Sequence, residues 1–346
     1  MRTFSFAQRF GSFLTTVATL TFILLVSIRG SSEGVDLIVS HPFPARHVQQ
    51  RLMLEPLKKE LEDKSKGRIR VTIHPGGALA GAPAHYENVV AGAFDIGWTL
   101  QGYTPGRFPL SSIVEMPFLW SSAQEATRVF WQLFEELPAL QKEYRDVRVL
   151  ATWTHDLGQL YTTSRPVRTI DDLRGLKIRA PGPVQTSMLR ALGAVPVTMP
   201  AGEVYDSLER GVVDGLVIGL SAIKGFRLDQ VVKHATLANF YVATMILAMN
   251  QQSYKKLSAE DRGLLDSLTG RRLAMLGAKN YDDEAADGLE ALKKAKASIY
   301  QLSPAEMDKW KQATAQMSKE WIKEMEGKRL PGKQVHDRML SLMEKR

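Results

Sequence analysis

The sequence predicts an α/β fold, and residues 171–215 are the part of the chain on which this prediction chiefly rests. Three short apolar stretches have the composition and spacing of strands, and two helical patterns lie between them. In order, these elements are strand 176–180, helix 184–192, strand 195–199, a short helix that begins at 202, and strand 216–218. Because strands that alternate with helices form parallel sheets, we expect a parallel sheet in this region.

The boundaries of these elements are marked by residue types with a defined backbone role. Ile178 lies between Lys177 and Arg179, which is the alternation of a strand, and Pro181 then stops the strand. Gly193 follows the first helical pattern at the position where glycine commonly ends a helix. Local chemistry and hydrophobic periodicity therefore agree on the same elements.

Length and composition fit a soluble globular protein with two domains. The chain has 346 residues, of which 24% are charged and 44% are hydrophobic. Its formal net charge is +8, but basic and acidic residues are mixed along the chain, so we expect no nucleic-acid partner. The chain contains no cysteine, which excludes disulfides, thiolate chemistry, cysteine-ligated metals and a lipid-anchored cysteine.

Residues 1–34 have the pattern of a secretory signal peptide. Arg2 and Arg9 precede an apolar run at 13–26, and a segment of small and polar residues follows it. The run is shorter than the roughly 20 residues that a membrane-spanning helix needs. We therefore expect export to the periplasm, with cleavage at one of several small residues near the end of this segment. An uncleaved membrane anchor is the alternative.

The same signals predict further elements along the rest of the chain. Strands are expected at 35–40, 68–74, 94–99, 147–154, 157–163, 240–250 and 298–302. Helices are expected at 47–65, 85–92, 123–133, 137–144, 258–296, 303–325 and 335–345. Leu52, Leu57 and Leu61 should face the core from the first of these helices, and Ser258 and Ser303 should cap two of the others.

Arg179 is the strongest candidate for a functional side chain. It lies at the end of the predicted strand 176–180, just before Pro181, so the sheet would hold its guanidinium in place. A guanidinium presents parallel N–H donors in a geometry that fits a carboxylate. A structural ion pair with Asp172 or Asp206 is the alternative interpretation.

Four linked motifs in this region carry a family resemblance. They are LRGLKIRAPG at 173–182 and then, within 191–215, the ALGAVPV segment, the EVY helix start and the GVVDG turn. In this order they resemble the extracytoplasmic solute-binding proteins of TRAP transporters, the DctP-type family. The resemblance continues more loosely along the rest of the chain.

The resemblance implies a two-lobed periplasmic-binding-protein clamp with a ligand cleft between the lobes, linked by crossing strands and a long helix. Lobe I would comprise residues 35–156 and about 245–284, lobe II residues 157–244 and about 285–330, and residues 331–346 would form a C-terminal tail helix. The resemblance also implies that lobe closure captures a small organic carboxylate, which is then delivered to the TRAP membrane permease subunits. It implies no cofactor.

The resemblance further indicates which residues would line the cleft beside Arg179. They are Trp98, Leu100, Gln101, Tyr103, Phe118, Gln159, Pro181, Ala201, Ile218 and Tyr241. Packing of Trp98 in the core is an equally open alternative. Many relatives carry a second basic residue where this chain has Gln159, and His155, Arg165 or Arg168 are possible substitutes for it.

Apolar residues around the predicted cleft favour a ligand with an apolar or aromatic body. Relatives that bind sugar acids commonly carry polar residues, including an amide, after the turn that ends at Gly215. This chain has the apolar run 216–220 there, and Ala201 near the cleft is small. Together with Arg179, the pattern favours a carboxylate on an apolar or aromatic body over a polyhydroxylated acid.

No catalytic motif supports an enzyme. The chain lacks Gly-x-Ser-x-Gly, His-Glu-x-x-His and Gly-x-Gly-x-x-Gly sequences, and its seven histidines are scattered. Glu203 and Asp214 could pair as catalytic carboxylates, but a helix N-terminus and a tight turn explain them better. We therefore expect neither an enzyme nor a metal site. The alternatives are a periplasmic module that presents its ligand to a sensor kinase, and a secreted enzyme acting on an organic acid.

Overall fold

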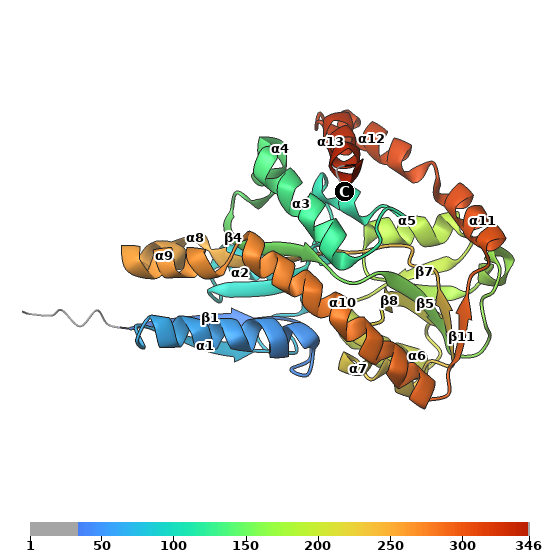
Figure 1. Cartoon of the computed structure of the whole chain (residues 1–346), viewed down its shortest axis with the longest axis horizontal. Coiled ribbons are helices and arrows are strands. Elements are labelled where there is room, and N and C mark those ends of the chain that lie inside the picture. The colour runs from blue at the N-terminus through green and yellow to red at the C-terminus, as the bar shows by residue number, and fades with distance from the viewer. Residues whose placement is uncertain (1–33, 345–346) are drawn as a thin grey trace, which may run out of the picture. The chain divides into compact units, whose positions relative to one another are not determined.

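The computed structural model describes residues 34–344, and these residues form one compact unit. The predicted signal peptide lies outside the described residues except for its last position. The described chain is a two-lobed α/β protein with one β-sheet in each lobe (Figure 1). The predicted fold class is confirmed. Within residues 34–344, no helix combines the length and the hydrophobicity that a membrane span requires.

The sheet of lobe I has five strands. In sheet order these are β2 (Ile69–His74), β1 (Val35–Ser40), β3 (Ile96–Leu100), β10 (Thr244–Asn250) and β4 (Val147–Thr154). β1 is parallel to β2 and β3, whereas β10 is antiparallel to β3 and β4. Because β10 comes late in the sequence, the chain leaves lobe I after β4 and returns to it after lobe II.

The sheet of lobe II has six strands. In sheet order these are β11 (Ser298–Gln301), β9 (His234–Leu237), β5 (Gly158–Thr162), β8 (Gly215–Gly219), β6 (Lys177–Ala180) and β7 (Val195–Thr198). β6 is parallel to β7 and β8, as predicted, but β5 is antiparallel to β8 and β9. The sheet is therefore mixed. β9 was not predicted.

Helices pack on both sheets (Figure 1). They are α1 (Glu55–Lys64), α2 (His85–Ala91), α3 (Ala123–Glu136), α4 (Pro138–Gln141), α5 (Pro183–Ala191), α6 (Val204–Glu209), α7 (Ala222–Gly225), α8 (Gln251–Lys256), α9 (Ala259–Leu268), α10 (Arg271–Lys294), α11 (Pro304–Thr314), α12 (Met317–Gly327) and α13 (Gly332–Glu344). The hydroxyls of Ser258 and Ser303 accept hydrogen bonds from the first turns of α9 and α11, which confirms both predicted caps.

The first predicted helix contains a π-helical turn that the periodicity did not show. This turn, Gln50–Leu54, comes directly before α1. Leu57 and Leu61 are buried as expected, but Leu52 is 42% exposed, so its predicted burial is wrong. A π turn contains one more residue than an α turn, and this shifts the buried side onto Met53 and Leu54.

The predicted helix 258–296 is two helices, α9 and α10, which meet at Gly270. Gly270 has φ 72°, a left-handed value that breaks the helix, and its amide donates to the carbonyl of Leu150 at 2.6 Å. The 24-residue helix α10 then contacts α3 and β4 of lobe I and α7 of lobe II. In Figure 1 it runs obliquely across the front of both lobes.

The predicted helix 303–325 is also divided, into α11 and α12. α11 contacts α5 of lobe II, whereas α13 packs against α12 and against α3 of lobe I. The guanidinium of Arg338 in α13 bonds to the carboxylate of Glu136 in α3 at 2.7 Å. The C-terminal helices therefore reach back over lobe I. The exact lobe boundaries stay a prediction, because the described chain forms a single compact unit.

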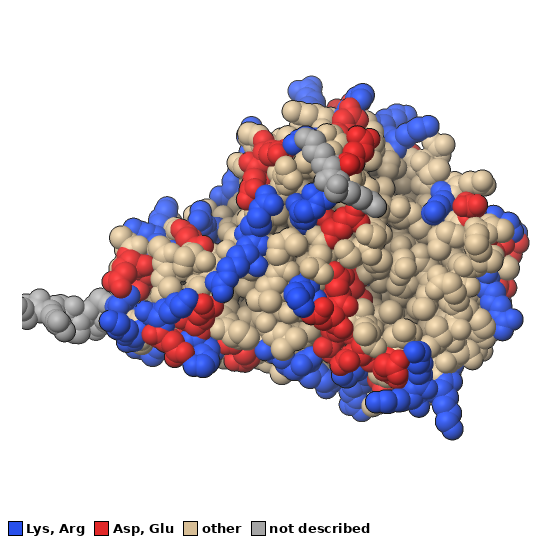
Figure 2. Space-filling model, viewed as in Figure 1, with Lys and Arg blue, Asp and Glu red and all other residues tan. Residues whose placement is uncertain are grey.

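The surface carries charges of both signs. On the face shown in Figure 2, basic and acidic side chains are interspersed over both lobes. Several form ion pairs, such as Arg51 with Glu284 at 3.1 Å and Lys224 with Asp287 at 2.9 Å. This face lacks the continuous basic stripe that a nucleic-acid backbone requires.

Two glycines in neighbouring helices should respond in opposite ways to substitution by alanine. A Cβ at Gly288 in α10 would lie 1.9 Å from the carbonyl oxygen of Leu220, so Gly288→Ala should lower the free energy of unfolding by about 1–3 kcal/mol. Nothing lies within 4 Å of a Cβ at Gly263 in α9, so Gly263→Ala should raise it by up to about 1 kcal/mol. Denaturant unfolding measures both, and a neutral Gly288→Ala would contradict this packing role.

Candidate functional site

A small cavity of about 40 Å³ lies between the two lobes. Leu100 at the end of β3 lines it from lobe I, and Arg179 in β6 and Ile218 in β8 line it from lobe II. Tyr281 on α10 and Tyr241 in the segment before β10 complete the wall. Because β6 and β8 are parallel neighbours, their carboxyl ends meet at one edge of the sheet. The cavity therefore lies where an α/β sheet usually binds its ligand.

The guanidinium of Arg179 is fixed by oxygen atoms from three elements. Its Nε donates to the carbonyl of Met199 at 2.9 Å, its Nη1 to the carbonyl of Val217 at 3.3 Å, and its Nη2 to the hydroxyl of Tyr103 at 3.5 Å. The residue is only 1% exposed. Rotation of the guanidinium would break these contacts, so the fork is held in one orientation.

The charge of Arg179 has no acidic partner among residues 34–344. The alternative partner Asp172 instead accepts hydrogen bonds from the backbone amides of Arg168 and Thr169, and no ion pair joins Arg179 to Asp206. A buried cation without a counter-ion is costly, because the desolvation of its charge is not compensated. An anion in the cavity would supply that compensation.

Aromatic rings form much of the cavity wall. Phe226 packs at 6.5 Å from the ring of Phe43 and at 5.8 Å from that of His47. His47 also lies 5.8 Å from the ring of Tyr281, nearly at right angles to it. These rings come from both lobes and from α10. Since they meet nearly edge to face, they provide an apolar wall that another ring can contact by its face or its edge.

Trp98 lies behind this wall and not in the cavity. It is fully buried, and its ring lies 4.3 Å from that of Phe43, 5.0 Å from that of His47 and 6.4 Å from that of Trp153. The core-packing alternative therefore describes its position. Trp98 can influence a ligand only through Phe43 and His47, whose rings it supports.

Two neighbouring ionisable residues, His155 and Asp156, also line the cavity. Burial lowers the pKa of His155 to about 4 and raises that of Asp156 to about 7. The carboxylate of Asp156 accepts hydrogen bonds from the hydroxyl of Ser221 and, at 3.1 Å, from its backbone amide. Burial also lowers the pKa of His47 to about 3. Between about pH 4 and pH 7 the charge of the cavity therefore comes from Arg179.

The structure brings together most of the predicted site residues. Those that line the cavity with Arg179 are Leu100, Tyr103, Pro181, Ala201, Ile218 and Tyr241. They share a position at or just after the carboxyl end of a strand, or in the crossing segment before β10. Contact of each with a ligand stays a prediction.

Gln159 and Gln101 lie outside this cavity, where neighbouring groups occupy their amides. Gln159 accepts hydrogen bonds from the backbone amides of Ala238 and Asn239 and donates to the side chain of Asn239. Gln101 donates to the hydroxyl of Thr152 at 3.0 Å and accepts from that of Tyr144 at 3.2 Å. Both glutamines thus hold chain segments in place.

Phe118 and the possible substitute cations also lie elsewhere. The ring of Phe118 packs 6.3 Å from that of Phe240, and its backbone amide bonds to the Phe240 carbonyl. Arg165 and Arg168 are exposed, and the Arg168 guanidinium lies over the ring of Tyr300. Among the described residues, His155 is the one proposed substitute that lines the cavity.

Sequence reasoning missed Phe43, His47, Phe226 and Tyr281. A signal existed for Phe43, since it follows the carboxyl end of β1, the same kind of position that singled out Arg179. Tyr281 lies in the middle of α10, where helical periodicity predicts burial but cannot distinguish a core contact from a cavity wall. Which buried aromatic faces a cavity depends on the packing of the two lobes.

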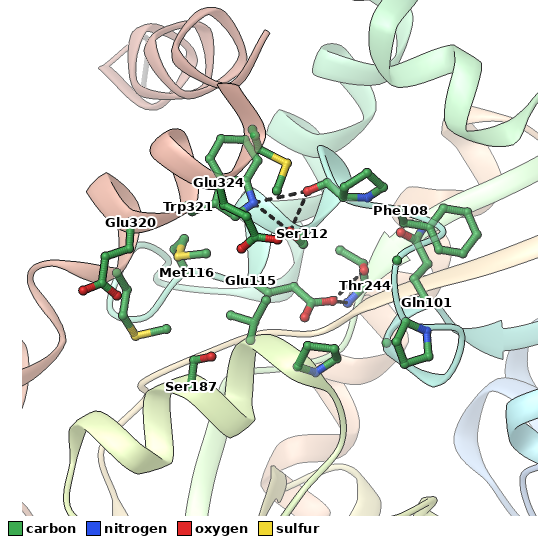
Figure 3. Close-up of a pocket in the computed structure, with 18 of the residues that line it drawn as sticks. Gln101, Phe108, Ser112, Glu115, Met116, Ser187, Thr244, Glu320, Trp321 and Glu324 are labelled. Atoms are coloured by element: carbon green, nitrogen blue, oxygen red, sulfur yellow. Dashed lines mark hydrogen bonds between the residues drawn. The ribbon is translucent and has the colours of Figure 1, made fainter. Parts of the chain in front are cut away.

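A second cavity, of about 200 Å³, lies among α5, α12 and a loop segment of lobe I (Figure 3). Figure 3 shows Glu115 in its wall, bonded to Thr244, and Glu320 and Glu324 on α12. Lys328 also lines it, but its ammonium pairs with Glu324 at 2.6 Å. The charged residues of this wall are thus three glutamates and one lysine that is already paired, an unfavourable set for an organic anion. The cavity between the lobes is therefore the candidate site for a carboxylate.

Solved structures with closely similar folds are solute-binding proteins. A TRAP solute-binding protein from Rhodoferax ferrireducens T118, in complex with benzoate, is 28% identical, has a TM-score of 0.86, and the match covers 90% of this chain and 98% of that one. A marine metagenome protein specific for aromatic acid ligands, in complex with 3-hydroxybenzoate, is 30% identical with the same TM-score and coverage. A Bordetella bronchiseptica protein with bound mandelate is 27% identical, with a TM-score of 0.84 and coverage of 90% and 99%.

The family model described as bacterial extracellular solute-binding protein, family 7, matches residues 39–324. This range includes both sheets apart from the first part of β1, and every residue that lines the cavity between the lobes. The resemblance first seen in the LRGLKIRAPG and GVVDG motifs thus extends over most of the chain. The chain belongs to this family, DctP, whose members are the solute-binding proteins of TRAP transporters.

Proposed function

We propose that this protein captures an aromatic carboxylate between its lobes and delivers it to a TRAP membrane permease. The observation that carries the proposal is the buried Arg179 guanidinium, which has no acidic partner among residues 34–344 and lies beside an aromatic wall. The benzoate, 3-hydroxybenzoate and mandelate complexes of similar proteins support an aromatic body for the ligand.

The two parts of such a ligand match the two kinds of wall. A carboxylate bonded to Arg179 would gain about 1.5–3 kcal/mol per charge-assisted hydrogen bond. An aromatic ring against Phe43 or Phe226 would gain apolar burial and about 0.5–1.5 kcal/mol per ring pair beyond it. A polyhydroxylated acid would place some of its hydroxyls against the apolar part of this wall, so the site favours the aromatic acid.

Closure of the lobes would complete the site. Hydrogen bonds that join the lobes include those from Arg46 Nε to the Gly225 carbonyl at 2.7 Å, from the Ala201 amide to the Tyr103 hydroxyl at 2.9 Å, and from Gln185 Nε2 to Glu115 Oε2 at 3.0 Å. With Arg179 only 1% exposed, a ligand must enter while the lobes are apart. Ligand that contacts both lobes then favours the closed form by the free energy of those extra contacts.

The family supports a location and a partner for this protein. Its members are extracellular solute-binding proteins. We place this protein in the periplasm, exported by the signal peptide in residues 1–34, and we assign the permease as the recipient of its ligand. The compared proteins support neither a sensor-kinase module nor an enzyme, so the bound acid should dissociate unchanged.

Loss of the Arg179 guanidinium should abolish tight binding of the acid. We expect Arg179→Met, which keeps much of the side-chain volume, to weaken benzoate binding at least about a hundredfold because the carboxylate loses its only cation. Isothermal titration calorimetry measures the change, and circular dichroism checks the fold. Arg190→Met, at an exposed position of α5, is the matched control and should bind like the wild type. Unchanged affinity in Arg179→Met would refute the anchoring role.

Affinity for an organic anion should fall as the pH rises above 7. The pKa of Asp156 is raised to about 7 by burial, so its carboxyl is neutral below this pH and ionised above it. The ionised form would repel the ligand carboxylate, and affinity should fall by up to about tenfold per pH unit. The pKa values of His47 and His155, about 3 and about 4, keep both neutral over this range.

Calorimetry with benzoate from about pH 6 to pH 9 tests this dependence. In Asp156→Asn the affinity should be nearly constant over the same range, because the amide does not ionise. A variant that keeps the wild-type slope would show that another group titrates. A flat profile in the wild type would contradict the role of Asp156.

A further inference from the structure

We infer that the cavity selects aromatic acids that carry a hydroxyl group, and that His155 Nε2 accepts the hydrogen bond of that hydroxyl. The inference rests on the proposed function, in which the cavity binds an aromatic carboxylate at Arg179. It adds a second polar contact, made by side-chain atoms that no hydrogen bond within the described chain uses.

The protonation of His155 follows from its contacts. Its Nδ1 lies within hydrogen-bonding distance of the backbone carbonyl oxygen of Asp156. A carbonyl oxygen can only accept, so Nδ1 carries the ring hydrogen. Burial and the nearby charge of Arg179 lower the pKa of His155 to about 4, so the ring is neutral at physiological pH. Nε2 is therefore a bare lone pair that can accept a hydrogen bond but cannot donate one.

This lone pair has no partner among the described residues. His155 is 7% exposed and lines the cavity, and its Nε2 makes no hydrogen bond within residues 34–344. Buried polar atoms in folded proteins are almost always hydrogen-bonded. An unpartnered acceptor in the wall of a ligand cavity indicates that the ligand supplies the donor.

Two tyrosine hydroxyls around His155 share this property. Tyr241 lies with its ring 5.2 Å from that of His155, and Tyr281 with its ring 6.4 Å away. Both are 1% exposed, both line the cavity, and neither hydroxyl has a partner within the described chain. By contrast, Tyr103 in the same wall bonds to Arg179 and Ala201. The unpartnered polar atoms thus gather on the side of the cavity formed by His155, Tyr241 and Tyr281.

The donor and acceptor pattern identifies the chemical class of the second group. A carboxylate offers acceptors only and cannot satisfy His155 Nε2. A hydroxyl can donate to Nε2 and also accept a hydrogen bond from Tyr241 or Tyr281. A methyl ether keeps the acceptor and loses the donor. The site should therefore prefer a hydroxylated aromatic acid over both the unsubstituted acid and its methoxy analogue.

Calorimetry with the mature protein tests this preference. The probes are benzoate, its three hydroxy isomers and its three methoxy isomers, with phenylacetate and its hydroxy derivatives as a longer series. We expect at least one hydroxy acid to bind tenfold or more tightly than both the unsubstituted acid and the matching methoxy acid. Equal binding of hydroxy and unsubstituted acids in both series would overturn the inference while leaving the proposed function in place. Failure of every aromatic acid to bind would overturn the proposed function itself.

Two variants test whether His155 Nε2 is the atom responsible for the preference for a hydroxyl group. His155→Phe keeps a ring but removes the acceptor, so the ratio of hydroxy to unsubstituted affinity should fall toward one. Tyr161→Phe is the matched control, because Tyr161 is buried with an unpartnered hydroxyl but does not line the cavity. Its affinity ratio should stay at the wild-type value. A wild-type ratio in His155→Phe would show that His155 is not the acceptor.

A spectroscopic measurement keeps the test independent of the variant. In ¹⁵N-histidine-labelled wild-type protein, the Nε2 resonance of His155 should have the shift of an unprotonated ring nitrogen. The chemical shift of this resonance should move toward that of a hydrogen-bonded nitrogen when the preferred hydroxy acid binds. It should not change when the methoxy acid binds. A protonated Nε2 in the free protein would overturn the inference.

Discussion

The buried guanidinium of Arg179 is the constraint on which the architecture of this site depends. Two backbone carbonyls of lobe II and the hydroxyl of Tyr103 from lobe I hold it in one orientation, and no carboxylate neutralises it within the described chain. Neutral oxygens fix its geometry but only partly offset the desolvation of the charge. A ligand carboxylate would act as the missing counter-ion, and its binding would offset the cost of burying the charge of Arg179.

Closure of the lobes and recognition of the ligand both depend on the removal of water from the space between the lobes. Tyr103 both contacts Arg179 and bonds to the backbone of Ala201 across the cavity, so the contact that orients the cation also joins the lobes. Helix α10 contributes Tyr281 to the wall and contacts both lobes. Once the lobes close, Arg179, His155 and Asp156 act in a low-dielectric environment, where charge and hydrogen-bond complementarity discriminate more strongly between ligands.

Sequence reasoning succeeded where a property depends on residues near one another in the chain. The strands of the 171–215 region, the caps at Ser258 and Ser303, and the position of Arg179 at the end of β6 all follow from local pattern. It failed where local patterns are ambiguous. The apolar residues keep a helical spacing across Gly270, so the break between α9 and α10 was not predicted. The spacing of the leucines also gives no sign of the π turn before α1, which leaves Leu52 exposed.

The sequence by itself determined the α/β class, the family, and a fixed cation at a strand end. Only the tertiary structure decided what surrounds that cation. Gln159 was a candidate by its place in the chain, yet the backbone of Ala238 and Asn239 occupies its amide, whereas Tyr281, more than a hundred residues after Arg179, lines the cavity. The reason is physical: strand and helix propensities act over a few residues, but burial and hydrogen-bond satisfaction depend on which distant segments the packed lobes bring together.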